Sequence, residues 1–116
     1  MLARCPRSPN CVSSIDHGNR HGVRPLVYTD SRQHARVHLQ RVLSQMRGAA
    51  LIKEQDNVLH YTFITPWFRF TDDVLFYFMP DKKVIHMRSA SRLGYYDFGV
   101  NRRRIERIRK VFCQVV

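Results

Sequence analysis

The segment HMRSASRLGYYDFGVNRRRIERIRK, residues 86–110, predicts a strand, a loop and a helix in succession. Side chains of residues 84–91 alternate between two sets, which is the period of a β-strand. Gly94 and Gly99 then interrupt the alternation and indicate a turn or loop. Asn101 is a favourable N-cap for a helix that is expected to run to the C-terminus. The apolar face of that helix consists of Ile105, Ile108, Phe112 and Val115.

Arginines at positions 102–104 fill the first turn of this predicted helix. A helix N-terminus carries partial positive charge, so each cation there is unfavourable by about 0.3–1 kcal/mol. Because local rules tend to fail at functional sites, we interpret the segment as a candidate anion site. Its candidate ligand-binding residues are Arg88, Ser89, Ser91, Arg92, Asp97, Asn101, Arg102 and Arg104. The alternative is a structural Arg–Asp network that holds the strand, loop and helix together without a ligand.

Residues 1–116 are long enough for one domain with a real core, and the hydrophobic content of 44% argues against disorder. The net charge of +11 favours acidic partners, such as nucleic acid, lipid head groups or phosphorylated or carboxylated ligands. No run of 18 apolar residues suggests a transmembrane segment. The N-terminus also lacks the apolar stretch of a signal peptide, so the chain as given is expected to be cytoplasmic.

The first 29 residues predict an irregular, Cys/Pro-rich segment, because prolines and glycines punctuate it without an apolar period. Cys5 and Cys11 lie within CPRSPNC. They form a disulfide in an oxidising compartment and remain free thiols or a metal pair in a reducing one, and the residues alone leave these alternatives open. Cys113 falls beside the apolar face of the last helix and is expected to be partly buried.

Residues 30–116 predict an α+β core. A helix is expected over residues 31–47, capped by Asp30 or Ser31 and ended by Gly48. Four strands with short connections follow, which indicates an antiparallel sheet. Together with the C-terminal helix they predict a two-layer domain with both helices on one face of the sheet. Aromatic residues of this region, Trp67, Phe68 and Phe70 among them, are expected to lie mostly in the core.

Catalytic and cofactor signatures give little support to an enzyme. There is no GxSxG, P-loop or Rossmann motif, and no cofactor is predicted. Asp72 and Asp73 are adjacent on a strand, so they are expected to face opposite sides of the sheet and not to share a proton. His34 and His38 lie one helical turn apart, but without an acidic third ligand they are interpreted as a solvated face, and no metal site is assigned.

Three segments, CPRSPNCVSS, FRFTDDV and VIHMRSASRLGYYDFGVNRRRIERIR, together resemble the family called domain of unknown function 1499 (DUF1499), from Cys5 to about Arg109. The resemblance implies a bacterial or plastid family without an established activity. Many of its members are predicted to be exported, membrane-anchored or plastid-targeted. The family pattern also suggests a pocket that joins the N-terminal Cys–Ser segment to the loop between Arg92 and Arg104.

Three functions remain in competition. The leading one is a non-enzymatic binding or accessory domain, whose arginines hold an anionic small ligand, a lipid head group or a partner's carboxylates. The second is a hydrolase or transferase that uses Ser89, Ser91 or a cysteine with Asp97 or a histidine. The third is nucleic-acid binding through the net positive charge.

Overall fold

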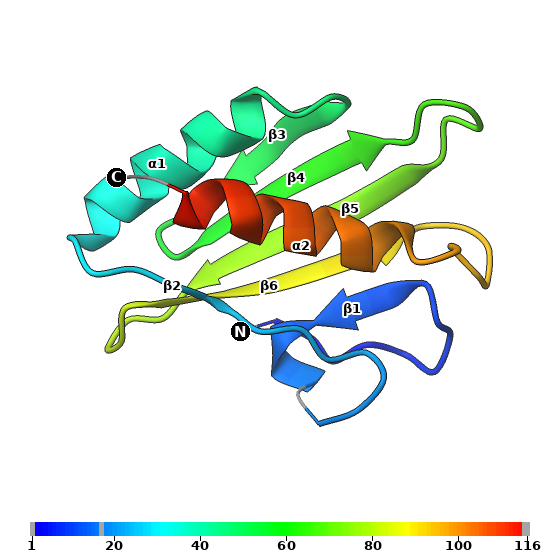
Figure 1. The fold of residues 1–116 in the computed structure, drawn as a ribbon, viewed down its shortest axis with the longest axis horizontal. Coiled ribbons are helices and arrows are strands. Elements are labelled where there is room, and N and C mark those ends of the chain that lie inside the picture. The colour runs from blue at the N-terminus through cyan, green and yellow to red at the C-terminus, as the bar shows by residue number, and fades with distance from the viewer. Residues whose placement is uncertain (1, 17, 115–116) are drawn as a thin grey trace.

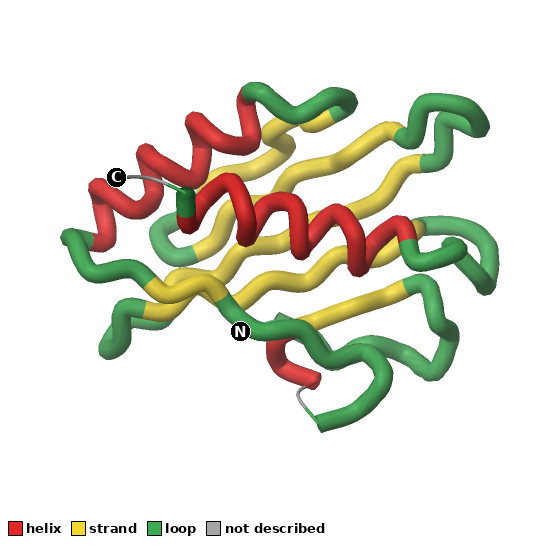
Figure 2. Tube along the Cα trace, viewed as in Figure 1, coloured by secondary structure: helices red, strands yellow, loops and turns green. Residues whose placement is uncertain are grey.

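The computed structural model describes residues 2–16 and 18–114, which form an antiparallel sheet with two helices. In chain order the elements are β1 (Cys11–Ser13), a 3-10 turn (Ser14–Asp16), β2 (Leu26–Val27), α1 (Arg32–Ser44), β3 (Ala49–Glu54), β4 (Val58–Ile64), β5 (Thr71–Phe78), β6 (Val84–Ser91) and α2 (Val100–Cys113). This confirms the predicted α+β class. Both helices lie on one face of the sheet (Figures 1 and 2).

The sheet order is β1-β6-β5-β4-β3, and β2 also pairs with β6. The four predicted strands correspond to β3–β6. Strands β1 and β2 come from the segment that was expected to be irregular, and both pair antiparallel with β6. They are too short to show an alternating pattern of their own, and their pairing partner lies more than 50 residues further along the chain. The sheet therefore has six strands where about four were expected.

Buried and half-buried side chains alternate along β5 and along most of β6, and this alternation assigns them to the two faces of the sheet. Val74, Phe76 and Phe78 are buried on the face that the helices cover, as are Ile85 and Met87 of β6. The helices contribute Leu39, Leu43, Ile105, Ile108 and Phe112 to the same core. Burying each of these large side chains stabilises the fold by roughly 1.5–3 kcal/mol before entropy is counted. The opposite face carries half-buried side chains such as Asp73 and Arg88.

The capping of α1 is confirmed, but that of α2 differs from the prediction. Ser31 accepts a hydrogen bond from the backbone N–H of His34, as an N-cap should. Helix α2 begins at Val100, so Asn101 lies inside its first turn. The Asp97 carboxylate takes over the capping role by accepting the N–H groups of Gly99 and Asn101, at 2.9 and 3.1 Å. Asn101 was the wrong choice because its side chain points into the interior.

At its other end α2 extends to Cys113, whereas Val115 lies outside the described residues. Cys113 is exposed, not partly buried as expected. Phe112 lies on the apolar face of α2 and is buried where α2 meets α1, so the next residue, Cys113, faces solvent.

Gly48 follows α1 with a left-handed backbone, φ +81°, and packs against β4. A Cβ built there would lie 2.6 Å from the carbonyl oxygen of Ile64. We expect Gly48→Ala to lower the free energy of unfolding by about 2–3 kcal/mol, from the left-handed penalty plus the clash. Gly94→Ala is the matched control, because Gly94 has φ +85° but nothing within 4 Å of its Cβ position. Urea unfolding of the two variants should separate the backbone penalty from the cost of the clash. Equal losses of unfolding free energy in the two variants would show that the clash is relieved without cost.

Candidate functional site

Asn101 is the centre of a buried polar network and is fully buried itself. Its side-chain oxygen accepts hydrogen bonds from Ser89 Oγ at 2.6 Å and from the Arg104 guanidinium at 2.7 Å. Its amide nitrogen donates to Ser91 Oγ at 3.0 Å and to Asp97 at 2.7 Å. The structure thus brings five of the eight predicted site residues into contact, where β6, the following loop and α2 meet.

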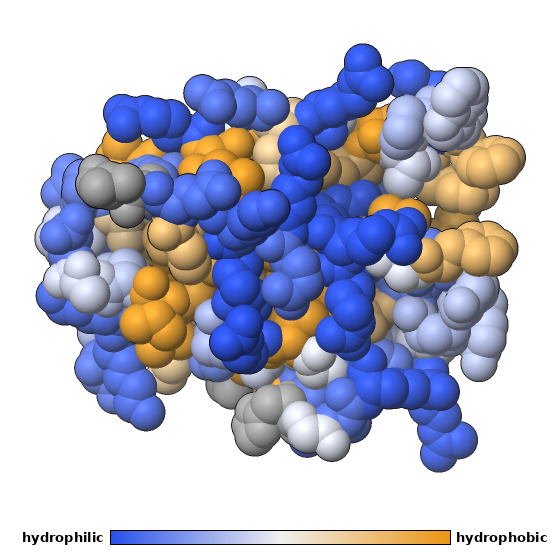
Figure 3. Space-filling view, in the orientation of Figure 1, coloured by the Kyte–Doolittle hydropathy of each residue, from blue (hydrophilic) through white to orange (hydrophobic). Residues whose placement is uncertain are grey.

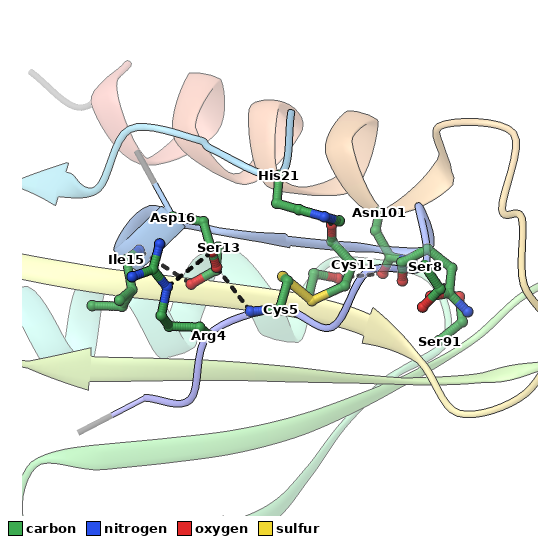
Figure 4. The surroundings of a disulfide bond; sticks show 12 residues. Arg4, Cys5, Ser8, Cys11, Ser13, Ile15, Asp16, His21, Ser91 and Asn101 are labelled. Carbon is green, nitrogen blue, oxygen red and sulfur yellow. Dashed lines mark hydrogen bonds and ion pairs between the residues drawn. A yellow bond between two sulfur atoms is a disulfide. The ribbon is translucent and has the colours of Figure 1, made fainter. Parts of the chain in front are cut away.

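The N-terminal segment also contributes to this network. Asn101 also donates to the backbone oxygen of Asn10 at 3.1 Å, and Asn10 donates its side-chain amide to Gly94 at 2.7 Å. Cys5 and Cys11 are bonded in a disulfide that closes residues 5–11, Asn10 among them, into a loop. Figure 4 shows Ser91 and Asn101 beside Ser8 and the disulfide. The disulfide therefore helps to hold the segment where Asn101 needs an acceptor.

Arg104 and Asp72 form the ionic part of the network. The guanidinium donates to one Asp72 carboxylate oxygen at 2.7 Å, and the two side chains are only 8% and 2% exposed. The guanidinium also lies over the Phe63 ring, 4.9 Å from its centroid. The other Asp72 oxygen, Oδ1, is buried and has no hydrogen-bond partner among the described residues. The charge of Arg104 is therefore already compensated inside the protein.

The other three arginines of the predicted site lie elsewhere. Arg92 forms a two-point ion pair with Asp73, at 2.9 and 3.0 Å, on the opposite face of the sheet. Hydrogen bonding from Arg92 lowers the pKa of Asp73 below its ordinary value, against the opposing effect of partial burial; His60, 2.8 Å away, lowers it further. As expected, Asp72 and Asp73 face opposite sides.

Arg88 also faces the side away from the helices, because it is one residue from the inward-facing Ser89. Its Nε is buried without a partner among the described residues. Arg102 donates to the backbone oxygens of Gly22 and Arg20, at 2.9 and 2.7 Å, and so fastens the N-terminal segment to α2. The structure does not bring the four arginines together around one ligand position.

A groove of about 1270 Å³ runs over β4 and β5 beside α2. Phe63, Asp72, Ser91 and Arg104 line it together with residues from the β4–β5 loop, the β6–α2 loop and the end of α1. Most of its lining surface is apolar. Figure 3 shows apolar side chains at the right-hand end of the molecule, next to a hydrophilic band along α2. The groove therefore has apolar and cationic surfaces side by side.

Besides Arg104, the groove has four cations that were not among the predicted site residues. Arg103, Arg107 and Lys110 line it from one side of α2, and Arg47 lines it from the end of α1. Arg103 donates to the backbone oxygen of Phe98. The side chains of Arg47, Arg107 and Lys110 form no hydrogen bond or ion pair with a described residue. The available signal in the sequence was the spacing of Arg103, Arg107 and Lys110, which lie four and then three residues apart on α2. That spacing did not show that Arg47 at the end of α1 lines the same groove.

The apolar rim was also mispredicted, because Trp67, Phe68 and Phe70 are exposed and do not lie in the core. Pro66 follows the last residue pairs of β4, and residues 65–70 leave the sheet as a loop. Once outside the sheet, these side chains have no helix above them. Leu93, Tyr96 and Phe98 of the β6–α2 loop form the opposite rim.

The described residues give no support to nucleophilic or metal chemistry. Ser89 is fully buried and donates to Asn101, and no described histidine is hydrogen-bonded to Ser89 or Ser91. Ser14 does lie 2.8 Å from His86, but its hydroxyl is buried and also accepts the backbone N–H of Met87. His34 contacts Asp30, and His38 contacts the backbone oxygen of Phe112. No group of potential metal ligands occurs in residues 2–16 or 18–114.

The fold and the network define a small α+β domain in which a disulfide-closed N-terminal segment is tied to a strand–loop–helix corner. The chain belongs to the family described as Protein of unknown function (DUF1499), whose model matches residues 1–112. Comparison with curated proteins and with solved structures found no match. Neither described helix has the length and apolar character needed to cross a membrane.

Proposed function

We propose that the chain is a non-enzymatic binding domain whose groove holds an amphiphilic molecule, with an apolar chain and an anionic end. The observation that carries the proposal is the pairing of an apolar groove with cations that have no partner among the described residues. Unpaired arginine and lysine side chains on a concave wall attract carboxylate or phosphate groups. The apolar walls supply the larger part of the binding free energy.

The anionic end of such a ligand belongs against Arg47, Arg107 and Lys110, not against Arg104. Asp72 already compensates Arg104, and a second anion there would compete with a buried ion pair. The proposed site therefore still binds an anion through basic side chains, but these lie further along α2 and at the end of α1. Neither alternative gains a comparable observation: among the described residues no histidine is hydrogen-bonded to Ser89 or Ser91, and nucleic-acid binding rests on the net charge of +11 alone.

Calorimetry with a homologous series of alkyl carboxylates, each below its micelle-forming concentration, tests this function. Affinity should rise about fourfold per added methylene until the groove is full, because burying one CH₂ contributes roughly 0.8 kcal/mol. Arg107→Ala should weaken binding about tenfold, for the loss of a charge-assisted hydrogen bond worth roughly 1.5 kcal/mol. Lys82→Ala is the matched control, since Lys82 is an exposed cation in the turn between β5 and β6.

An affinity independent of chain length, or equal losses in Arg107→Ala and Lys82→Ala, would contradict the proposal. Titration of a short DNA duplex at several salt concentrations examines the nucleic-acid alternative. Binding that weakens steeply with salt, in the absence of alkyl carboxylate binding, would favour that alternative instead.

A further inference from the structure

Two loops emerge from the same end of the sheet, the β4–β5 loop (residues 65–70) and the β6–α2 loop (residues 92–99). The ends of the strands are paired, Ile64 with Thr71 and Asp72 with Ser91. The N–H of Arg92 also donates to the Thr71 carbonyl at 3.1 Å, so the bases of the loops are adjacent. Figure 1 shows both loops projecting at the right-hand end of the molecule. We call these two loops the aromatic tip.

The aromatic tip gathers the exposed aromatic side chains of the described structure. Trp67, Phe68 and Phe98 are 89%, 78% and 75% exposed, and Phe70, Tyr95 and Tyr96 are exposed too. All other large apolar side chains exposed in residues 2–16 and 18–114 are aliphatic. Such a concentration at one end is a recognised mark of an interaction surface.

The tip is held in shape by its own hydrogen bonds. In the β4–β5 loop, the Thr65 N–H donates to the Phe70 carbonyl at 2.9 Å, and the Thr65 carbonyl accepts the Arg69 N–H at 3.0 Å. The Thr65 hydroxyl accepts the Phe70 N–H at 2.8 Å. The Phe68 and Phe70 rings stack at 5.7 Å. Arg69 and Phe98 both have left-handed backbones, a conformation that bulky side chains rarely adopt. The loops therefore present these rings outward in a defined arrangement.

The charges around the tip are mainly positive. Arg69 lies between Phe68 and Phe70, and Arg103, Arg107 and Lys110 follow along α2. The acids nearby are largely engaged: Asp73 pairs with Arg92, Asp72 with Arg104, and Asp97 caps α2. Aromatic side chains favour the interface between lipid and water, and clusters of Lys and Arg are attracted to anionic head groups.

We propose that the aromatic tip docks on the surface of an anionic lipid bilayer. Trp67, Phe68 and Phe98 insert at the level of the head groups, while Arg69 and the cations of α2 contact phosphates. This docking goes beyond the groove's ligand and does not require one. The charge surplus favours a bilayer over a second copy of the chain, because two equally cationic tips would repel each other.

Trp67 is the only tryptophan of the chain, so its fluorescence reports directly on the tip. Vesicles of phosphatidylcholine and phosphatidylglycerol in equal amounts should co-sediment the protein and shift the Trp67 emission to shorter wavelength. Vesicles of phosphatidylcholine alone should bind at least tenfold more weakly, and added salt should reduce the difference. Absence of co-sedimentation with either vesicle overturns the proposal.

The double variant Phe68→Ala/Phe98→Ala should lower the partition coefficient at least tenfold while leaving the circular dichroism spectrum unchanged, because both rings are exposed. Ile52→Ala is the control, since Ile52 is exposed on β3, outside the tip. Equal losses in the two variants overturn the proposal, as does an emission shift that appears without vesicles and grows with protein concentration, which indicates self-association. A wild-type protein that binds alkyl carboxylates but neither kind of vesicle refutes the docking alone and leaves the proposed function standing.

Discussion

Arg104→Ala is expected to lower the free energy of unfolding by about 3–5 kcal/mol, because it leaves the Asp72 carboxylate buried without a partner. Asp72 is almost fully buried, and its second oxygen already lacks a hydrogen-bond donor among the described residues. The variant also removes the bonds from Arg104 to Ser89 and Asn101 and its contact with the Phe63 ring. For a chain of this size the loss corresponds to a fall in Tm of roughly 12–20 °C.

Urea unfolding of the wild type and Arg104→Ala measures this loss, and Arg107→Ala is the control. Arg107 is an exposed arginine one helical turn away, and its removal should change stability by less than about 0.5 kcal/mol. The double variant Asp72→Leu/Arg104→Met should recover most of the loss, because apolar replacement of both partners of a buried ion pair is often neutral or stabilising. If Arg104→Ala loses less than about 1 kcal/mol, the pair is solvated and the network is not structural.

Removal of the disulfide, in Cys5→Ala/Cys11→Ala, is expected to lower the free energy of unfolding by about 2–4 kcal/mol. The bond closes a loop with a sequence separation of 6, which removes roughly 2 kcal/mol of chain entropy from the unfolded state. A further loss is expected because the bond holds β1 and Asn10 against β6, where Asn10 accepts from Asn101 and from the Ser91 N–H.

Unfolding of the oxidised protein with and without a phosphine reductant gives the same comparison without mutation. Cys113→Ser is the control, since Cys113 is the free, exposed cysteine among the described residues, and its replacement should leave both curves unchanged. Hydrogen exchange should localise the effect: reduction of the disulfide should speed exchange of the Ser91 amide more than exchange of amides in the centre of β5. A reductant-insensitive midpoint would show that the N-terminal segment is held by its hydrogen bonds alone.

Both predictions concern stability, whereas the two proposals concern surfaces that contribute little to it. The buried network uses Asp72, Ser89, Asn101 and Arg104 to fix the corner from which the β6–α2 loop and α2 begin. The groove and the aromatic tip lie on the surface next to that corner. Residues that resembled a ligand site in the sequence therefore form the support, and the exposed residues around them carry the proposed binding.

The members of the buried network lie close along the chain, but the sequence did not show how they are connected. Ser89, Ser91, Asp97, Asn101 and Arg104 come into contact in the structure, whereas their predicted role in holding a ligand stays a prediction. Arg88, Arg92 and Arg102 belong to the same stretch but point to three other places. An arginine pairs with whichever carboxylate or carbonyl the fold brings within reach, and the pairs here span 19 to 82 residues.

The sequence by itself determined the α+β class, the two helices, strands β3–β6 and the opposite orientation of Asp72 and Asp73, because each depends on local periodicity and on the geometry of a strand. Only the tertiary structure decided the additions of β1 and β2, the bond between Cys5 and Cys11, and the exposure of Trp67, Phe68 and Phe70. The strand pairings and the exposure of the three rings depend on whether segments distant in the chain come together, whereas the disulfide joins cysteines six residues apart whose redox state the residues alone left open. A local pattern of side chains does not specify which distant segment a strand will pair with. Nor does it show whether any segment will cover an apolar loop.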